Sequence, residues 1–371
     1  MNDDGVDSAV TTAQTGNVNY TATEDISLAS VVATGGRATI NTSSGAIIDN
    51  GDVAVDIEAQ QAELDAFAGI GDSDAIDTSL TDLDAYNADS GNINISNTGT
   101  PALNLVDLDL DGHAVLNDST HATDNNITID VASDLNVNDK VEAPGSVNLN
   151  ANTGNLNVND EVIAGDEANL YAANDITQTV TTIHGIGDVT ATNDVNFIAG
   201  GAITMEDDGV NTAVTTSQTG NVNYTASGDI RLGRVVATNG RATINTSGGA
   251  IIDNGDTGGS DIHALQADLD ADQGIGYDPS SLTPDNALET ELGDLDAKNV
   301  ASGNINIDNT GTLNLVDLDA DGYAVLNDSL HPVDNDVTIN VASDLNVNDN
   351  VEATGSVNLN ANTGNLNVND E

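Results

Sequence analysis

An aspartate-rich motif occurs twice in the sequence, with the spacing of a calcium-binding loop. Its aspartates stand at positions 1, 3, 5 and 12, with glycine at position 6: Asp107, Asp109, Asp111, Gly112 and Asp118 in the first copy, and Asp317, Asp319, Asp321, Gly322 and Asp328 in the second. Oxygen ligands at these positions bind Ca²⁺ in EF-hand loops, where the glycine permits a sharp turn. The motif therefore indicates two candidate calcium sites, and the sequence itself requires no cofactor.

Two features of the motif keep a second interpretation open. Position 12 is aspartate rather than the bidentate glutamate, and position 8 is Ala114 or Ala324 rather than a larger aliphatic residue. No amphipathic helices flank the motif, and residues 104–108 and 113–116 are typical of short strands instead. The alternative is therefore a corner between two strands, without a bound ion.

The strands that would position these loops are clearest in residues 145–161. Val147, Leu149 and Ala151 alternate with asparagines, an Asn-Thr-Gly turn follows, and Leu156 and Val158 alternate with asparagines again. A period of two places one face inside and the other outside, which is the pattern of a half-buried strand. The same letters return at residues 355–371, so the chain is built from a strand–corner–strand module. The side chains expected to point inward are Val147, Leu149, Leu156 and Val158, with Val357, Leu359, Leu366 and Val368 in the second copy.

Two copies of one large unit make up the chain. Asn2 corresponds to Glu206, Ser90 to Ser302 and Glu161 to Glu371, so the offset runs from 204 through 212 to 210. The first unit is predicted to span residues 1–204 and the second, truncated unit residues 205–371, continuous with the first in one rod. Because residue 1 lies at an internal position of the repeat, we interpret the chain as a segment of a longer array.

A shorter period within each unit predicts the fold. The module begins at equivalent positions, 20 or 21 residues apart in the regular stretches and 27 apart where a loop is inserted: Val18, Ala38, Ile93, Ile127, Val147, Ala168, Val195, Val222, Ala242, Ile305, Val337 and Val357. No turn of this length can bury its apolar face alone, so neighbouring turns must stack about 4.8 Å apart, as in an all-β parallel β-helix. At about 21 residues a turn, the chain would form about 17 turns. Asparagine amides at outward or corner positions would then form ladders from turn to turn.

Residues 264–271 fit two kinds of secondary structure. Leu265 and Leu269 are four apart, which suits a helix, but Leu265, Ala267, Leu269 and Ala271 also alternate strictly. The stacked turns expected on either side favour a strand, with these four side chains on one face.

Charge and composition limit the kinds of partner. The chain has 6 basic and 61 acidic residues, a net charge of −55, so it repels nucleic acid and anionic membranes and attracts cations. It has no cysteine, which excludes disulfides and thiolate metal sites. Aromatic residues make up 2% of the chain, so we expect a thin interior of Val, Ile, Leu and Ala. Nucleic-acid binding and membrane insertion are both unexpected.

Histidine predicts no metal site. His121 and His331 correspond between the copies and suit solvated loops, whereas His113 is replaced by Tyr323 in the second copy. No partner is expected for His184 or His263.

Three segments resemble the repeats of filamentous-haemagglutinin-type exoproteins, which are giant bacterial surface or secreted proteins: residues 187–205, 240–255 and 302–315. The resemblance covers nearly the whole chain. It implies a right-handed parallel β-helix that serves as the shaft of an adhesin-like fibre, located outside the cell or on the bacterial cell surface. That family offers no catalytic residues to transfer to this chain.

The sequence therefore favours a structural shaft with no chemistry of its own. Its expected partners are other copies of the array, neighbouring fibres, and host or cell-surface glycans bound through regions outside this chain. One alternative is a calcium-binding extracellular matrix or filament-forming protein. A more remote one is a polysaccharide-active β-helix enzyme, although 6 basic residues are few for acidic sugars. Arg37 and Arg241 correspond between the copies and are expected to pair with carboxylates of neighbouring turns.

Overall fold

The chain folds as an all-β parallel solenoid, with about 14 turns of roughly 24 residues. A computed structural model describes residues 10–51, 54–121, 125–181, 185–255, 259–278, 280, 286–331 and 334–369. Those residues form strands, turns and loops without a helix, and hence contain no helix that could span a membrane. His184 lies outside the described residues.

Contacts in space divide the structure into two compact units. The first comprises residues 1–174 and 181–191, and the second residues 175–180 and 192–371. This division follows contacts in space, whereas the boundary between residues 204 and 205 follows the sequence repeat. The two-copy division of the chain therefore stays a prediction from sequence.

The strands of the first unit are short, apart from β4, β6 and β8. They are β1 (Val10–Thr12), β2 (Val18–Ala22), β3 (Ile26–Leu28), β4 (Ser30–Thr42), β5 (Ile47–Asp49), β6 (Ile57–Ala66), β7 (Ile76–Ser79), β8 (Asp82–Asn87), β9 (Ile93–Asn97), β10 (Leu103–Leu105), β11 (Val115–Asn117), β12 (Ile127–Val131), β13 (Leu135–Val137), β14 (Val141–Ala143), β15 (Val147–Ala151), β16 (Leu156–Val158), β17 (Val162–Ala164), β18 (Ala168–Ala172), β21 (Gly185–Ile186) and β22 (Val189–Ala191).

The second unit repeats this series with strands of matching length. They are β19 (Ile176–Gln178), β23 (Val195–Ala199), β24 (Ile203–Met205), β25 (Val214–Ser217), β26 (Val222–Ala226), β27 (Ile230–Leu232), β28 (Arg234–Thr246), β29 (Ile251–Asp253), β30 (Ile262–Ala271), β31 (Leu288–Glu291), β32 (Asp294–Asn299), β33 (Ile305–Asn309), β34 (Leu313–Leu315), β35 (Val325–Asn327), β36 (Val337–Val341), β37 (Leu345–Val347), β38 (Val351–Ala353), β39 (Val357–Ala361) and β40 (Leu366–Val368). The short strand β20 (Val180–Thr181) has one residue in each unit.

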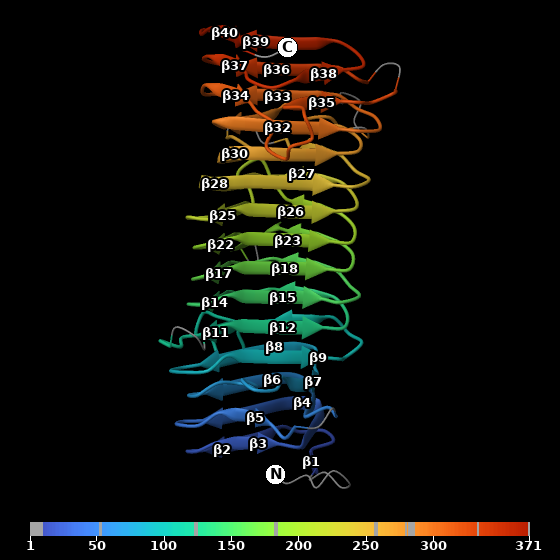
Figure 1. Cartoon of the computed structure of the whole chain (residues 1–371). Coiled ribbons are helices and arrows are strands. Elements are labelled where there is room, and N and C mark those ends of the chain that lie inside the picture. The colour runs from blue at the N-terminus through green and yellow to red at the C-terminus, as the bar shows by residue number, and fades with distance from the viewer. Residues whose placement is uncertain are drawn as a thin grey trace. The chain divides into compact units, whose positions relative to one another are not determined.

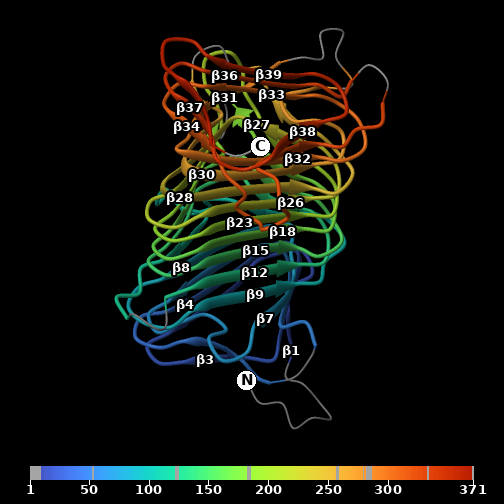
Figure 2. The same ribbon diagram turned by 45° about the horizontal axis from the view of Figure 1, so that its top comes forward.

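The predicted module starts stand opposite one another in parallel register. In the first unit Ile93 pairs with Ile127, Ile127 with Val147, and Val147 with Ala168. Figure 1 shows the strands β12, β15 and β18 of this column stacked one above another, and Figure 2 shows β9, β12 and β15 from a steeper angle. The second unit continues the pattern, with Val195 opposite Val222 and Val337 opposite Val357. The parallel stacking expected from sequence is confirmed.

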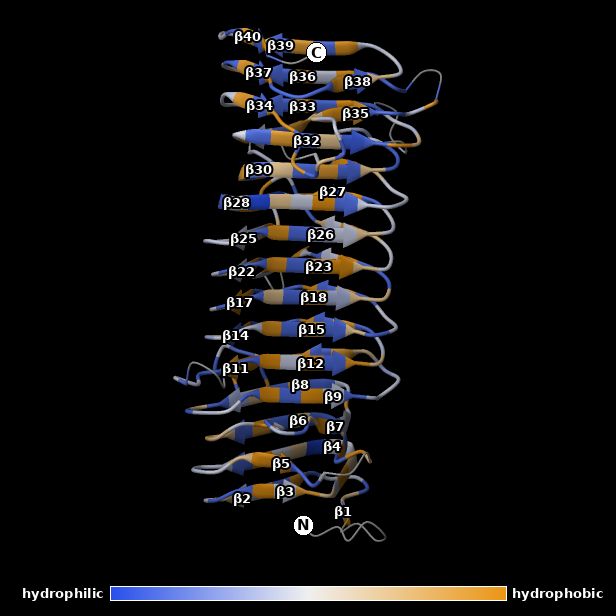
Figure 3. Ribbon diagram, viewed as in Figure 1, coloured by the Kyte–Doolittle hydropathy of each residue, from blue (hydrophilic) through white to orange (hydrophobic). Residues whose placement is uncertain are grey.

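Alternation along the strands builds the core as expected. Val147, Leu149, Leu156 and Val158 are fully buried, while the asparagines between them are partly exposed. Figure 3 shows this as alternating apolar and polar bands along the strands. Burial of apolar area stabilises the folded chain in proportion to the area removed from water. The stacked aliphatic columns therefore provide most of the stability of this thin interior.

Side chains of the last turn stand in the inward columns as expected, but three of them are exposed. Val357 is 42% exposed, Leu366 46% and Val368 63%, although Val357 stands in register with buried Val337. Among the described residues, β39 pairs with β36 and β40 with β37, so a neighbouring turn covers these strands on one side only. Their side chains share the inward columns but lack a second covering layer.

Asparagine ladders join the turns, and they show why the mean turn is longer than 20 or 21 residues. Asn157 Nδ2 donates to Asn136 Oδ1 over 2.8 Å across a 21-residue turn. Asn136 Nδ2 donates to Asn104 Oδ1 over 2.9 Å, although 32 residues separate these two. Inserted loops thus lengthen the turns without changing the ladder, so the solenoid has fewer turns than the 17 estimated from the shortest period.

Residues 264–271 belong to strand β30, as favoured over the helix. The expected face is wrong for Leu265, which is 54% exposed, whereas Ala267, Leu269 and Ala271 are buried. Pairing with β28 shifts its register here, because Ala264 stands opposite Ala237 and Gln266 opposite Arg241. The chain turns a corner at Leu265, which resets the alternation.

Candidate metal sites

The two aspartate motifs form loops that fold around their own carboxylates. In the first unit the loop connects β10 to β11, and Gly112 N donates to Asp107 Oδ2 over 2.9 Å. Asp111 N donates to Asp109 Oδ1 over 3.0 Å. Leu110 and Gly112 adopt positive φ angles of 71° and 99°, which produce the tight turn. Short strands flank the loop, as the strand-corner interpretation expects.

The loop in the second unit has the same geometry. Gly322 N donates to Asp317 Oδ2 over 2.9 Å, and Asp321 N donates to Asp319 Oδ1 over 2.8 Å. Ala320 and Gly322 have φ angles of 68° and 97°. Ala320 replaces Leu110, and Tyr323 replaces His113. The two loops nevertheless adopt the same backbone conformation.

Each loop brings two of its aspartates to a third from an earlier strand. In the first unit the group is Asp84, Asp107 and Asp109, and in the second it is Asp296, Asp317 and Asp319; within each group the three ligand atoms lie within 4.8 Å of one another. Asp84 lies on β8 and Asp296 on β32, and both are nearly fully buried. Leu108 N donates to Asp84 Oδ2 over 2.6 Å, which fixes the loop over that strand. Carboxylate oxygens are ligands that a hard divalent cation such as Ca²⁺ prefers.

The buried aspartate of each group has an unusual proton affinity. Burial raises the pKa of Asp84 to about 7, against the hydrogen bond from Leu108, and the charges of Asp109, Asp111 and Asp107 raise it further. Burial likewise raises the pKa of Asp296 to about 7, with added repulsion from Asp268 and Asp319. A divalent cation within the group would favour the ionised form and oppose both effects.

The other predicted ligands lie apart from these groups. Asp111 and Asp321 are in the same loops but are not members of the three-carboxylate groups. Asp118 follows β11, where its charge raises the pKa of Tyr86 after the larger effect of burial. Asp328 follows β35 in the same way. The structure thus brings together motif positions 1 and 3 with a residue that the motif does not contain.

A third acidic group lies in the second unit and was not predicted from sequence. It comprises Asp253, Asp261 and Glu289, whose ligand atoms lie within 4.8 Å of one another. Asp253 and Asp261 are buried, and Glu289 N donates to Asp261 Oδ2 over 2.8 Å. Glu289 lies 28 residues after Asp261, and the three acids follow no ligand spacing, so only the stacking of turns reveals the group.

The two corresponding arginines pair with carboxylates of the next turn, as expected. Arg37 forms an ion pair with Glu63, and Arg241 forms one with Asp268. The same is true of a histidine for which no partner was expected, because His263 Nδ1 lies 2.8 Å from Glu291 Oε2. In a chain with so few basic residues, the two arginines offset part of the negative charge around them.

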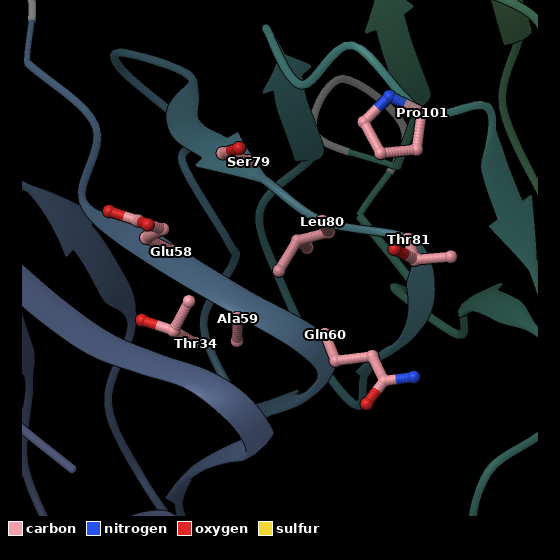
Figure 4. Close-up of a pocket in the computed structure, with 8 residues that line it drawn as sticks. All are labelled: Thr34, Glu58, Ala59, Gln60, Ser79, Leu80, Thr81 and Pro101. Carbon is pink, nitrogen blue, oxygen red and sulfur yellow. The ribbon is translucent and has the colours of Figure 1, made fainter. Parts of the chain in front are cut away.

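A hollow of about 200 Å³ on the first unit contains little that could perform chemistry. Figure 4 shows the eight side chains that line it, which are Thr34, Glu58, Ala59, Gln60, Ser79, Leu80, Thr81 and Pro101. Glu58 is the one ionisable group among these eight, so the lining lacks the pair of carboxylates that glycoside hydrolysis needs. Pro101 belongs to the two-residue insertion that distinguishes the first copy.

No protein-family model matches the chain, and no curated protein and no solved structure matches it either.

Proposed function

We propose that the chain is a shaft segment of a giant secreted or cell-surface, adhesin-like fibre, related in kind to the filamentous-haemagglutinin-type exoproteins. The proposal includes a right-handed sense for the β-helix and assigns the chain no catalytic chemistry. The observation that carries it is the repeated parallel register, in which one side-chain column continues through β9, β12, β15 and β18. Such a stack grows by adding turns, so its natural role is to supply length and stiffness.

The proposed partners follow from this role. Further turns of the same array would continue each stack, and neighbouring fibres or surface glycans would be bound by parts of the protein beyond this chain. The net charge of −55 favours separation of neighbouring shafts and keeps nucleic acid away.

Immunogold electron microscopy of the producing cells tests the proposal. Antibodies raised against this chain should label the cell exterior, at a distance from the envelope, in cells that are neither broken nor permeabilised. Label that appears only after permeabilisation would overturn the assignment. An unrelated cytoplasmic protein stained in parallel shows that the cells are intact.

A calcium-binding matrix or filament protein is the second candidate, favoured by the repeated groups of three aspartates. Asp84, Asp107 and Asp109 would hold Ca²⁺ in the first unit, and their counterparts would hold it in the second. A cation that binds the folded chain alone stabilises it by about 2.7 kcal/mol at a free concentration of 100 Kd.

A thermal melt titrated with calcium chloride, against sodium chloride at equal ionic strength, distinguishes binding from screening. Specific binding predicts a higher melting temperature with calcium. The double variant Asp109→Asn with Asp319→Asn should lose the part of this gain that comes from the two loop groups, while Glu58→Gln, which removes an exposed carboxylate outside all three groups, should keep the whole gain. Equal melting curves in the two salts would leave only diffuse screening.

A further inference from the structure

A second hollow of the first unit combines aromatic rings with carboxylates. It encloses about 380 Å³, and its lining includes the rings of Phe67 and Tyr86 and the carboxylates of Asp65, Asp109 and Asp111. We call it the aromatic–acidic pocket. Phe67 is 39% exposed and Tyr86 is partly exposed, so both rings are accessible from solvent. The pocket therefore offers negative charge beside an apolar surface.

The carboxylates of the pocket lie close enough to affect one another's proton affinity. Burial raises the pKa of Asp65, and although a hydrogen bond from Asn41 Nδ2 opposes this, the charges of Glu63, Asp109 and Asp111 add to the rise. The pKa of Tyr86 is also raised, first by burial and then by Asp118, Asp111 and Asp65. Carboxylates from two turns, that of β6 and that of β10 and β11, thus act on one small volume.

The second unit fills the corresponding place with an ammonium group of its own. Asp65 pairs with Tyr86 and Tyr86 with Leu116 in the first unit, as Asp270 pairs with Lys298 and Lys298 with Leu326 in the second. Lys298 therefore stands where the first unit has Tyr86. Likewise Asp272 follows β30 at the place where Phe67 follows β6.

Lys298 shows that the acidic groups of the second unit pair with an ammonium group. Its Nζ lies 2.6 Å from Asp321 Oδ2. The pKa of Lys298 is raised, first by that hydrogen bond, and its charge is further favoured by Asp321, Asp270 and Asp319. These three aspartates correspond to Asp111, Asp65 and Asp109 of the pocket. The second unit thus carries an alkylammonium group on the same acidic frame.

We propose that the aromatic–acidic pocket binds an alkylammonium group from outside the chain, the chemistry of a lysine side chain. Asp65 and Asp111 supply charge-assisted hydrogen bonds, and the rings of Phe67 and Tyr86 contact the alkyl stem and attract the cation through their faces. The site goes beyond the proposed shaft role, because it adds a ligand to one unit only. In the second unit, Lys298 pairs with Asp321, the equivalent of Asp111, and Asp272 stands in place of Phe67.

The basic groups around the pocket set the conditions for testing it. His113 Nδ1 lies 3.8 Å from Asp111 Oδ1, and its Nε2 lies 3.4 Å from Glu142 Oε2. Lys140 Nζ lies 2.5 Å from that same glutamate, and Arg37 pairs with Glu63. Because these basic groups already stand close to carboxylates around the pocket, every titration is run at one fixed pH and one ionic strength. A chelator removes divalent cations that would share Asp109.

The chain offers a direct readout, because it contains only 2 phenylalanines. With fluorinated phenylalanine, ¹⁹F NMR should show two signals, one from Phe67 in the pocket and one from Phe197, which is fully buried in the second unit. Nα-acetyl-lysine N-methylamide should shift the Phe67 signal saturably and leave the Phe197 signal unmoved. The Nε-acetylated analogue has nearly the same shape without the charge and should produce no shift.

Variants that exchange the two units' residues complete the test. Tyr86→Lys should place an ammonium on Asp111 and weaken binding by about tenfold or more, and Asp111→Asn should weaken it by a similar factor. The double variant Lys298→Tyr with Asp272→Phe should add a third signal that responds to the lysine derivative. An unmoved Phe197 signal confirms that the second unit of the single variants remains folded.

Two results would overturn the proposal: an equal shift with the neutral analogue, or unchanged binding by both Tyr86→Lys and Asp111→Asn. Butylamine distinguishes the sources of the ammonium. Equal affinity for butylamine assigns the site to small amines, whereas tighter binding of the lysine derivative assigns it to a peptide lysine. Neither result depends on whether the chain is part of a shaft.

Discussion

Asn87 and Asn117 lie side by side in successive turns of the first unit, and Asn87 Nδ2 donates a 3.0 Å hydrogen bond to Asn117 Oδ1. Both side chains are fully buried. Asn87 Oδ1 accepts from Gly69 N over 2.8 Å, and Asn117 Nδ2 donates to Asn126 O over 3.0 Å. The second unit repeats the arrangement with Asn299 and Asn327. Buried amides thus join the backbone of several turns at one corner of each stack.

Substitution of Asn117 by alanine should destabilise the first unit by about 1–3 kcal/mol, because it leaves buried polar groups without partners. Urea unfolding followed by circular dichroism measures the loss. Asn157→Ala is the control, since Asn157 lies on the outer ladder, where water can replace its bond to Asn136. A loss for Asn157→Ala as large as that for Asn117→Ala would show that burial of the corner amides contributes nothing extra.

Leu149→Asp should destabilise the stack by at least about 3 kcal/mol, because it places a carboxyl group between two buried turns. Leu149 pairs with Ile129 on one side and Leu170 on the other. Its neighbour Asn148 faces outward, so Asn148→Asp should change stability by less than about 1 kcal/mol. Thermal melts of the two variants should therefore separate clearly, and coincident melts would contradict the assigned faces.

A buried aromatic pair in the second unit gives a third prediction. The rings of Phe197 and Tyr224 stack with centroids 4.7 Å apart, and both side chains are fully buried. Phe197→Ala should cost about 3–5 kcal/mol through lost contacts and the cavity left behind. Phe67→Ala removes the other phenylalanine, which is partly exposed, and should cost much less. Equal costs in denaturant unfolding would be inconsistent with this core.

The contribution of Asp84 and Asp296 to the free energy of unfolding should fall as the pH rises from about 4 to about 7. Burial raises the pKa of both to about 7, so the folded chain holds their protons more tightly than the unfolded chain does. Their contribution is therefore present at low pH and is lost as the pH passes through the folded-state pKa. It amounts to a few kcal/mol for each carboxyl, as an order of magnitude.

Urea unfolding in a chelator at pH 5 and pH 8 measures this effect. The double variant Asp84→Asn with Asp296→Asn should show a weaker dependence on pH, because an amide does not titrate. A Glu58→Gln control should keep the dependence of the unaltered chain. If the double variant and the unaltered chain lose stability equally over this range, other groups must be responsible.

Residues with a strict alternation were placed correctly from sequence, because stacked turns demand a continuous apolar column. Val147 and Leu149 are buried for this reason. Phe197 and Tyr224 each stand at the same place after a module start, Val195 or Val222, so their stacking could also have been predicted. Leu265 was misplaced because a corner within β30 resets the alternation, and no glycine or proline in the sequence marks that corner.

The acidic groups were only partly predictable. Spacing alone identified Asp107 and Asp109, because both lie within one loop. Asp84 alternates with Leu83 and Ala85 and should therefore face solvent, yet it is 4% exposed because the loop of the next turn covers it. Contacts of this kind depend on where a loop folds back, which local patterns do not encode. The one available signal in the sequence was that the second copy also has an aspartate, Asp296, at the position of Asp84.

The outer asparagine ladder keeps its hydrogen-bond length while the chain between its rungs varies. Bonds of 2.8, 2.8 and 2.9 Å join asparagines that are 21, 27 and 32 residues apart. The ladder is therefore indifferent to what the loops contain, and selection can lengthen, shorten or exchange them one at a time. A lineage that carries such a scaffold can acquire new surface features by insertion, without having to rediscover a fold that tolerates them.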